Sequence, residues 1–203
     1  MNNIKFSIFD FFAYLIPGSI ILLAFTVIFN PSLTRIADVS KQFKGIDIST
    51  GLVAIIVSYV IGFAADSIGS WLYTYIACKF LGSPKLGIEN RLTFSEQRAL
   101  VRQFSLENFQ FIHNWKVLKT MSHNLSCAFL ILMTSLFIKI PQTDAGERFQ
   151  WFLLALIALV MSIIFMRRAH VFDTWHYRNL TTTVEALHLE KRALKDADLY
   201  QDS

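Results

Sequence analysis

The stretch IFDFFAYLIPGSIILLAFTVIF, residues 8–29, decides the fold class of this chain, because it carries a single charge, Asp10, among apolar residues. About 20 helical residues cross the roughly 30 Å of hydrocarbon in a bilayer. Without water to satisfy the backbone amides, such a stretch is expected to form a transmembrane helix. Three similar stretches follow, and they are Leu52 to about Cys78, Met121–Ile140 and Phe149–Met166.

The composition of the whole chain supports this interpretation. Of 203 residues, 54% are apolar and 17% are charged, whereas soluble globular proteins average about a quarter charged residues. The apolar content argues against a disordered protein, and two cysteines are too few for a secreted disulfide scaffold. We therefore expect an all-α polytopic membrane protein with four transmembrane helices and a small cytoplasmic helical bundle.

The distribution of Lys and Arg predicts the orientation and the organisation. Both terminal segments and the stretch 79–120 together hold 14 of these residues, and the two opposite loops hold five. By the positive-inside rule, both termini are cytoplasmic. The predicted parts are transmembrane helices 1 and 2 in residues 1–81, a cytoplasmic helical segment in 82–120, transmembrane helices 3 and 4 in 121–168, and a cytoplasmic C-terminal helix in 169–203.

Two capping boxes predict helix starts in the cytoplasmic part. They are Thr93-Phe94-Ser95-Glu96 and Thr182-Thr183-Val184-Glu185, and in each the first hydroxyl and the last carboxylate satisfy amides of the first turn. The second box predicts the start of a C-terminal helix. After the first box, apolar residues with helical spacing predict a helix leading into the third transmembrane helix, and these are Phe104, Phe111, Ile112, Trp115 and Leu118.

Asp66 is the most informative single residue, because it is the only acidic residue well inside an apolar stretch. At 100° per residue it shares one face of its helix with small and polar residues, and the stripe is Ser58, Gly62, Ala65, Asp66, Gly69 and Tyr73. One interpretation is close helix packing. The other is a pore or water-filled seam, with an acidic ring if the protein oligomerises. A proton relay is a third.

Two further features are candidate functional elements. Pro17-Gly18 in the middle of the first span predicts either a static packing kink or a hinge that gates. The basic and aromatic residues of the cytoplasmic segment could bind an anionic lipid, a nucleotide, an oligonucleotide or a partner protein, although ordinary positive-inside loops look the same. This surface comprises Arg98, Arg102, Trp115, Lys116 and Lys119.

The sequence contains no pattern that indicates an enzyme. The five histidines lack the spacing of metal ligands, and HExxH, Walker, GxSxG and CxxC motifs are absent. We therefore predict no catalytic residue, no metal site and no cofactor.

The opening Phe9-Asp10-Phe11-Phe12-Ala13-Tyr14-Leu15-Ile16-Pro17-Gly18 resembles the first span of small bacterial inner-membrane proteins, some of them encoded in anti-phage defence loci. The four-helix layout with a basic cytoplasmic loop is similar to that of membrane components of Hailong-type and Kiwa-type systems. This resemblance implies a bacterial inner membrane, a homotetramer, and a channel or sensor that a cytosolic partner or ligand holds inactive.

Two functional hypotheses follow from these observations. The first is an oligomeric membrane effector, an ion-conducting channel controlled from its cytoplasmic side. A single four-helix bundle fills its own centre with side chains, so the conducting path would lie between subunits. The second is a non-conducting membrane sensor or scaffold that recruits a cytosolic partner protein.

Overall fold

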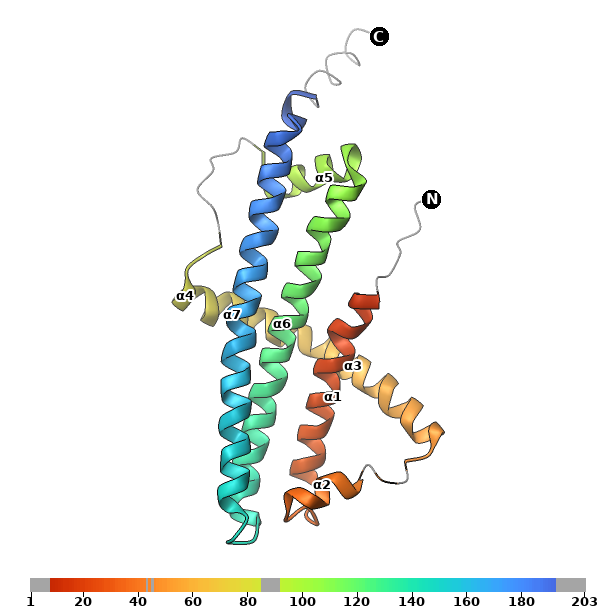
Figure 1. Ribbon diagram of the computed structural model, residues 1–203, viewed down its shortest axis with the longest axis vertical. Coiled ribbons are helices and arrows are strands. Elements are labelled where there is room, and N and C mark those ends of the chain that lie inside the picture. Colours follow the sequence, from red (N-terminus) through yellow and green to blue (C-terminus); the bar gives the residue numbers. More distant parts are fainter. Residues whose placement is uncertain (1–7, 43, 45, 85–91, 193–203) are drawn as a thin grey trace.

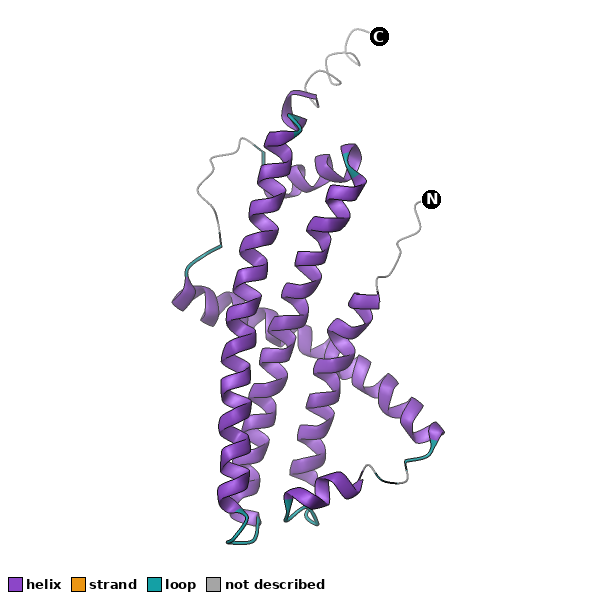
Figure 2. Cartoon of the chain, viewed as in Figure 1, coloured by secondary structure: helices purple, strands orange, loops and turns teal. Residues whose placement is uncertain are grey.

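The computed structural model describes residues 8–42, 44, 46–84 and 92–192, and every regular element among them is a helix (Figure 2). The helices in chain order are α1 Ile8–Phe29, α2 Ile36–Gln42, α3 Ile48–Leu72, the π-helical turn η1 Tyr73–Ala77, α4 Cys78–Leu81, α5 Phe94–Phe104, α6 Leu106–Lys139, the short 3-10 turn η2 Ile140–Gln142, and α7 Arg148–Ala186. The prediction of an all-α fold is confirmed.

Four helices are long and apolar enough to cross a membrane, and the chain is a multi-pass membrane protein. The four candidate spans are Phe11–Phe29, Ile48–Leu81, Leu106–Gln142 and Arg148–Ala186. The second of them joins α3, η1 and α4 into one continuous helix. The predicted first stretch, residues 8–29, coincides with α1.

Helices α6 and α7 form a long antiparallel hairpin with the most extensive contact in the fold (Figure 1). Neither helix contains a Gly or a Pro, so no residue interrupts either one. At 1.5 Å per residue, their 34 and 39 residues extend about 51 and 58 Å, well beyond the roughly 30 Å of a hydrocarbon core. Both helices project beyond this core at the end that carries α5, and we call this end the hairpin side. We call the opposite end, which carries α2 and the connection between α6 and α7, the loop side.

Helix α1 lies beside α6, and α3 crosses the layer formed by α1, α6 and α7 at a steep incline (Figure 1). The crossing is possible because α1 and α3 meet at glycines. A Cβ at Gly18 would lie 1.7 Å from the carbonyl oxygen of Ser58, and a Cβ at Gly62 would lie 1.9 Å from that of Tyr14. The two backbones are therefore in direct contact.

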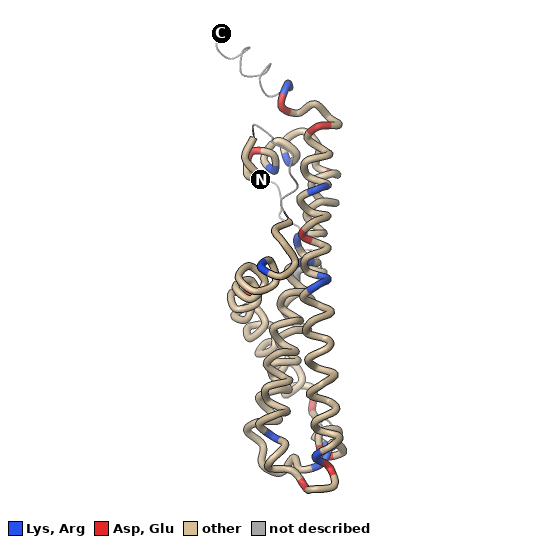
Figure 3. Tube along the Cα trace, turned by 90° about the vertical axis from the view of Figure 1, so that its left-hand side faces the viewer, with Lys and Arg blue, Asp and Glu red and all other residues tan. Residues whose placement is uncertain are grey.

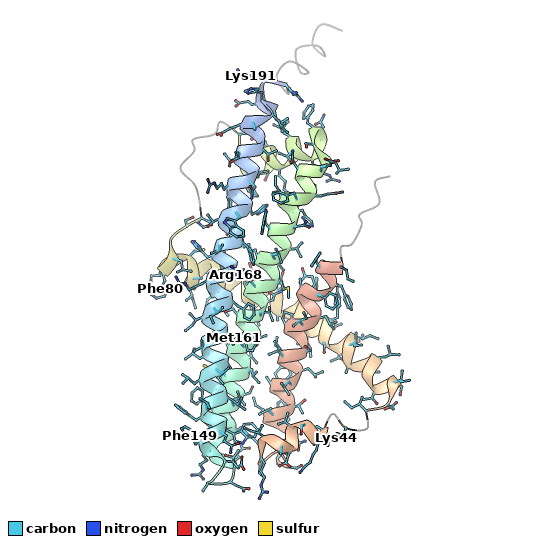
Figure 4. The ribbon with its side chains drawn as sticks, in the orientation of Figure 1. Lys44, Phe80, Phe149, Met161, Arg168 and Lys191 are labelled. Carbon is cyan, nitrogen blue, oxygen red and sulfur yellow. The ribbon has the colours of Figure 1, made fainter. Side chains whose placement is uncertain are left out.

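The distribution of charge and apolar surface marks the membrane zone. Along the described chain, charged residues run from the upper end of the molecule to about its middle and gather again at its lower end, with few in the zone between the middle and the lower end (Figure 3). Large apolar side chains between these ends are exposed, among them Ile56 on α3 and Ile164 on α7. In Figure 4, Phe80 and Arg168 lie at one level on the hairpin side, and Phe149 and Lys44 lie on the loop side.

The hairpin side carries a small helical cluster in which α5 packs against α6 and α7. Its buried residues are Val101, Ile112, Leu180, Val184 and Leu189. The predicted capping box at the start of α5 is confirmed, since the Thr93 amide donates to the Glu96 carboxylate at 2.6 Å and the Glu96 amide donates to the Thr93 hydroxyl at 3.4 Å. These contacts fix the start of α5.

Two helix boundaries differ from the sequence prediction. A break at Ser105, where φ is −153° and ψ is 83°, separates α5 from α6. The predicted helix start at Thr182 is wrong, because α7 continues to Ala186 and the Thr182 hydroxyl donates to the carbonyl of Arg178 at 2.8 Å. With no Gly or Pro between residues 148 and 186, nothing ends the fourth span at its last apolar residue.

Candidate functional site

A buried polar cluster lies where η1 meets α6 and α7, and Tyr73 is at its centre. The Tyr73 hydroxyl donates to Oδ2 of Asp173 at 2.8 Å, and Lys119 Nζ lies 2.9 Å from Oδ1 of the same carboxylate. Lys119 Nζ also lies 4.8 Å from the centroid of the Tyr73 ring. Asp173 is almost fully buried, so its carboxylate needs these two partners to offset the cost of burying its negative charge.

A π-helical turn positions Tyr73 in this cluster. Residues Tyr73–Ala77 form η1, which directly follows the regular α3, and both Tyr73 and Ala77 are buried. Single π turns inside α-helices are rare and often lie at functional sites. Here the turn lets the helix contact α7 as well as α6, so one side chain joins the inclined helix to the long hairpin.

A second polar pair continues the cluster towards the middle of the span. Nε2 of His123 on α6 lies 3.0 Å from Oδ1 of Asp66 on α3, and the His123 ring stacks on Tyr73 with centroids 6.2 Å apart. Gly69 permits this approach, because a Cβ there would lie 2.9 Å from Oδ1 of Asn124 and 3.0 Å from the His123 ring. The cluster thus places a carboxylate and an imidazole within hydrogen-bonding distance of each other, on two of the candidate spans.

The predicted stripe on the inclined helix faces neighbouring helices of the same chain. Ser58, Gly62, Ala65, Gly69 and Tyr73 are all buried. Ser58 and Gly62 contact α1, and Ala65 belongs to a core cluster with Ile21 and Ala128. The structure therefore brings these residues together in helix contacts, and a pore lined by them stays a prediction.

Asp66 differs from the other members of the stripe, because 36% of its side chain is exposed. It lies at the edge of the buried face, next to polar residues that sequence reasoning missed. Ser67, Ser70 and Thr74 are exposed on the same helix, within 100° of Asp66 at 100° per residue. None of these three hydroxyls donates to a residue within the described part of the chain, whereas Ser19 and Thr26 donate to carbonyls of their own helix.

The Pro17-Gly18 pair lies at the crossing of α1 and α3. Pro17 is fully buried, and α1 continues through it from Ile8 to Phe29. Gly18 is held against the Ser58 carbonyl of α3. The structure assigns this pair a packing contact, and a hinge role stays a prediction.

The predicted cytoplasmic surface is divided by the structure. Lys119 pairs with Asp173, and Arg98 on α5 lies over the ring of Phe109, 5.6 Å from its centroid. Trp115 packs edge-on against Trp175 with ring centroids 4.8 Å apart. Lys116 and Arg102 are exposed. Only these last two side chains are largely available to a ligand.

No group of three or more His, Cys, Asp or Glu within the described ranges is arranged to hold a metal ion. His123 and Asp173 were missed because their partners lie on another helix, and the hydroxyls of Ser67, Ser70 and Thr74 were missed because they lie beside the predicted stripe and not in it. One signal was present, since Ser122-His123-Asn124 places three polar residues at the start of an apolar stretch.

Comparison of the chain with known proteins finds no matching family model, no matching curated protein and no matching solved structure.

Proposed function

We propose that the protein is an oligomeric membrane effector that conducts ions between its subunits and is controlled from the hairpin side. The observation that carries this proposal is the face with exposed polar side chains on the second half of α3 and the start of η1. Asp66 is partly exposed there, and Ser67, Ser70 and Thr74 are exposed beside it. We infer that this face lines the conducting path, rather than the buried stripe that contains Asp66 at its edge.

The cost of exposing a carboxylate to lipid supports this assignment. A charged residue at the centre of a span costs about 2.5–3.5 kcal/mol on insertion scales, and more on an isolated helix. His123 offsets part of that cost through its contact with Asp66. Water between subunits would solvate the exposed oxygen and the three hydroxyls together, which lipid does not. A ring of such carboxylates favours cations.

The polar cluster supplies a route for control. Tyr73 connects the inclined helix to Asp173. Asp173 lies in the second half of α7, which continues to the hairpin side and packs there against α5. A partner or ligand that displaces this part of α7 would act on the Tyr73 hydrogen bond. Because Tyr73 follows Asp66 by about two helical turns on a continuous helix, the displacement would reach the proposed path.

The proposed setting is the inner membrane of a bacterium, with the hairpin side in the cytoplasm. The excess of Lys and Arg in the segments of that side supports the orientation, with 14 such residues against five in the opposite loops. The homotetramer and the role in anti-phage defence are supported only by the resemblance of the first span and the layout. No enzymatic activity is proposed.

Ion flux through reconstituted vesicles tests the proposal. Asp66→Asn keeps an oxygen that accepts from His123 and removes the charge, so we expect assembly to persist and cation flux to fall. Asp38→Asn is the matched control, because Asp38 lies on α2 outside the candidate spans and pairs with Lys41 at 2.8 Å. Equal flux through both variants and the unchanged protein would contradict the proposal.

The second candidate function, a non-conducting scaffold, is favoured by one apolar groove near the hairpin side. It has a volume of about 250 Å³ and is lined by Phe9, Phe111, Asn114, Trp115, Val117 and Leu118. Phe111 is half exposed. Three results together would favour the scaffold function over the channel function. Phe111→Ser would abolish the cellular phenotype of the protein, Asp66→Asn would leave that phenotype intact, and no condition would produce ion flux.

A further inference from the structure

A cleft separates α1 from the first half of α3. From their contact at Gly18 and Gly62 the two helices diverge towards the loop side, and α2 lies at the wide end (Figure 1). The cleft has a volume of about 490 Å³. Its apolar walls include Leu15, Ile16, Leu22, Leu23, Ala54 and Ile55.

The depth of the cleft corresponds to one leaflet of a bilayer. Its wall on α1 runs from Leu15 to Thr26, which is about 16 Å at 1.5 Å per residue. Half of a hydrocarbon core is about 15 Å. Both walls belong to candidate spans, and the cleft is open on one side, so acyl chains are the surrounding medium.

Two of the three hydroxyls that line the cleft, those of Ser19 and Thr26, do not call for a polar ligand. Ser19 donates to the carbonyl of Ile16 at 2.8 Å, and Thr26 donates to the carbonyl of Leu22 at 2.9 Å. Both donors are therefore satisfied by α1 itself. An apolar chain can lie against them without leaving a donor unpaired.

The wide end of the cleft carries positive charge. Gln42 and Ile46 line it, and Lys44 lies between them in the chain. Lys41 is occupied by Asp38, and Arg35 is 3.5 Å from Asp144. Lys44 is exposed, and no carboxylate of the described residues lies within ion-pair distance of it. Its position in Figure 4 is at the loop-side end, where a headgroup of that leaflet would lie.

We propose that this cleft binds one anionic phospholipid of the loop-side leaflet. One acyl chain fills the space between α1 and α3, and the phosphate pairs with Lys44. The lipid would cover the apolar walls that diverge from the Gly18–Gly62 contact and so stabilise the inclined position of α3. The site involves a different part of α3 from the face that carries Asp66, so this proposal does not rest on ion conduction.

Photocrosslinking in vesicles tests the site. The probe is phosphatidylglycerol with a diazirine near the end of one acyl chain, present as a minor component in phosphatidylcholine vesicles. After irradiation, mass spectrometry should find more label on the cleft peptides of α1 and α3 than on the exposed apolar face of α7 around Ile164. Equal labelling of the two surfaces would overturn the proposal.

Two matched pairs of variants separate the acyl chain from the headgroup. Ala54→Phe fills the cleft, whereas Val53→Phe enlarges a neighbouring side chain that is already 59% exposed and does not line it. We expect cleft labelling to fall to the level of the α7 face only in Ala54→Phe. Lys44→Gln, an exposed change that leaves folding intact, should remove the preference for the phosphatidylglycerol probe over its phosphatidylcholine analogue, and Lys79→Gln should keep it.

A second copy of the chain is the competing occupant. If the cleft were covered by another subunit, a photoreactive residue at Ala54 would give crosslinked peptides from two chains and little lipid adduct. That result would overturn the proposal, as would unchanged lipid preference in Lys44→Gln.

Discussion

The contact between α1 and α3 can be tested by adding one methyl group. A Cβ at Gly18 would lie 1.7 Å from the Ser58 carbonyl oxygen, whereas ordinary contacts of a Cβ begin at 3.4 Å. Gly18→Ala therefore requires the two helices to separate by roughly 1.5 Å or more, a large distance for atoms in van der Waals contact. The obstacle is a backbone atom, so no side-chain rotation relieves the clash.

We expect Gly18→Ala to lower the free energy of unfolding by about 1–3 kcal/mol, the range for an overpacked contact. The control is Gly51→Ala on α3, where a Cβ meets nothing within 4 Å. Because Ala is favoured over Gly inside a helix by roughly 0.5–1 kcal/mol, the control should be slightly stabilised. Thermal unfolding of the purified protein in detergent measures both, and equal Tm values for the two variants would refute the crossing described here.

Three further predictions concern single side chains. Hydrogen bonds from the Thr93 hydroxyl and amide lower the pKa of the Glu96 carboxyl below its ordinary value of 4.5. The ionised carboxylate therefore stabilises α5 above pH 4.5, and this stabilisation is lost as the pH falls through the lowered pKa. Amide hydrogen exchange in α5 should accelerate on acidification, and Glu96→Gln should remove this pH dependence. Asp173→Asn leaves its lysine partner uncompensated and should lower the free energy of unfolding by about 3 kcal/mol, the low end for a broken buried pair because that lysine is a quarter exposed; thermal unfolding measures this loss. Ser126 and Ser162 each donate to the other's backbone carbonyl across α6 and α7, at 2.8 and 2.9 Å. Because alanine keeps each backbone acceptor and removes only the donor, Ser126→Ala and Ser162→Ala should each lower the free energy of unfolding by about 0.6 kcal/mol; unchanged thermal unfolding of both variants would contradict this geometry.

The transmembrane helices were predictable because crossing a bilayer requires only a long apolar stretch, which is a local property. Residues 8–29 coincide with α1 for that reason. The extent of α7 was underestimated, since hydropathy ends at Arg167-Arg168 while the helix continues to Ala186. Hydropathy locates the boundary of the membrane, but it does not locate the end of a helix. The two would coincide only if a helix breaker such as Gly or Pro stood at the membrane boundary.

The site was predictable only in part. Asp66 stood out because a charge in an apolar stretch is costly, and that cost requires a partner. The partner, His123, follows Asp66 by 57 positions, and the pairing depends on how α3 crosses α6. Nothing in the periodicity of either helix specifies that crossing. The same holds for Tyr73 and Asp173, which are 100 positions apart and meet through a π turn that no residue pattern indicates.

The steep incline of α3 gives the protein a geometric response to bilayer thickness. The continuous helix from Ile48 to Leu81 has 34 residues and extends about 51 Å, far more than the hydrocarbon it crosses. A helix that exceeds the local thickness accommodates by tilting further when the membrane thins. With the Gly18–Gly62 contact as a fixed point, thinning would swing the two ends of this helix in opposite directions. The area that the protein occupies in the membrane plane would then grow as acyl chains shorten. Distances between spin labels on the two ends of this helix and on α6 would report that change in bilayers of graded chain length.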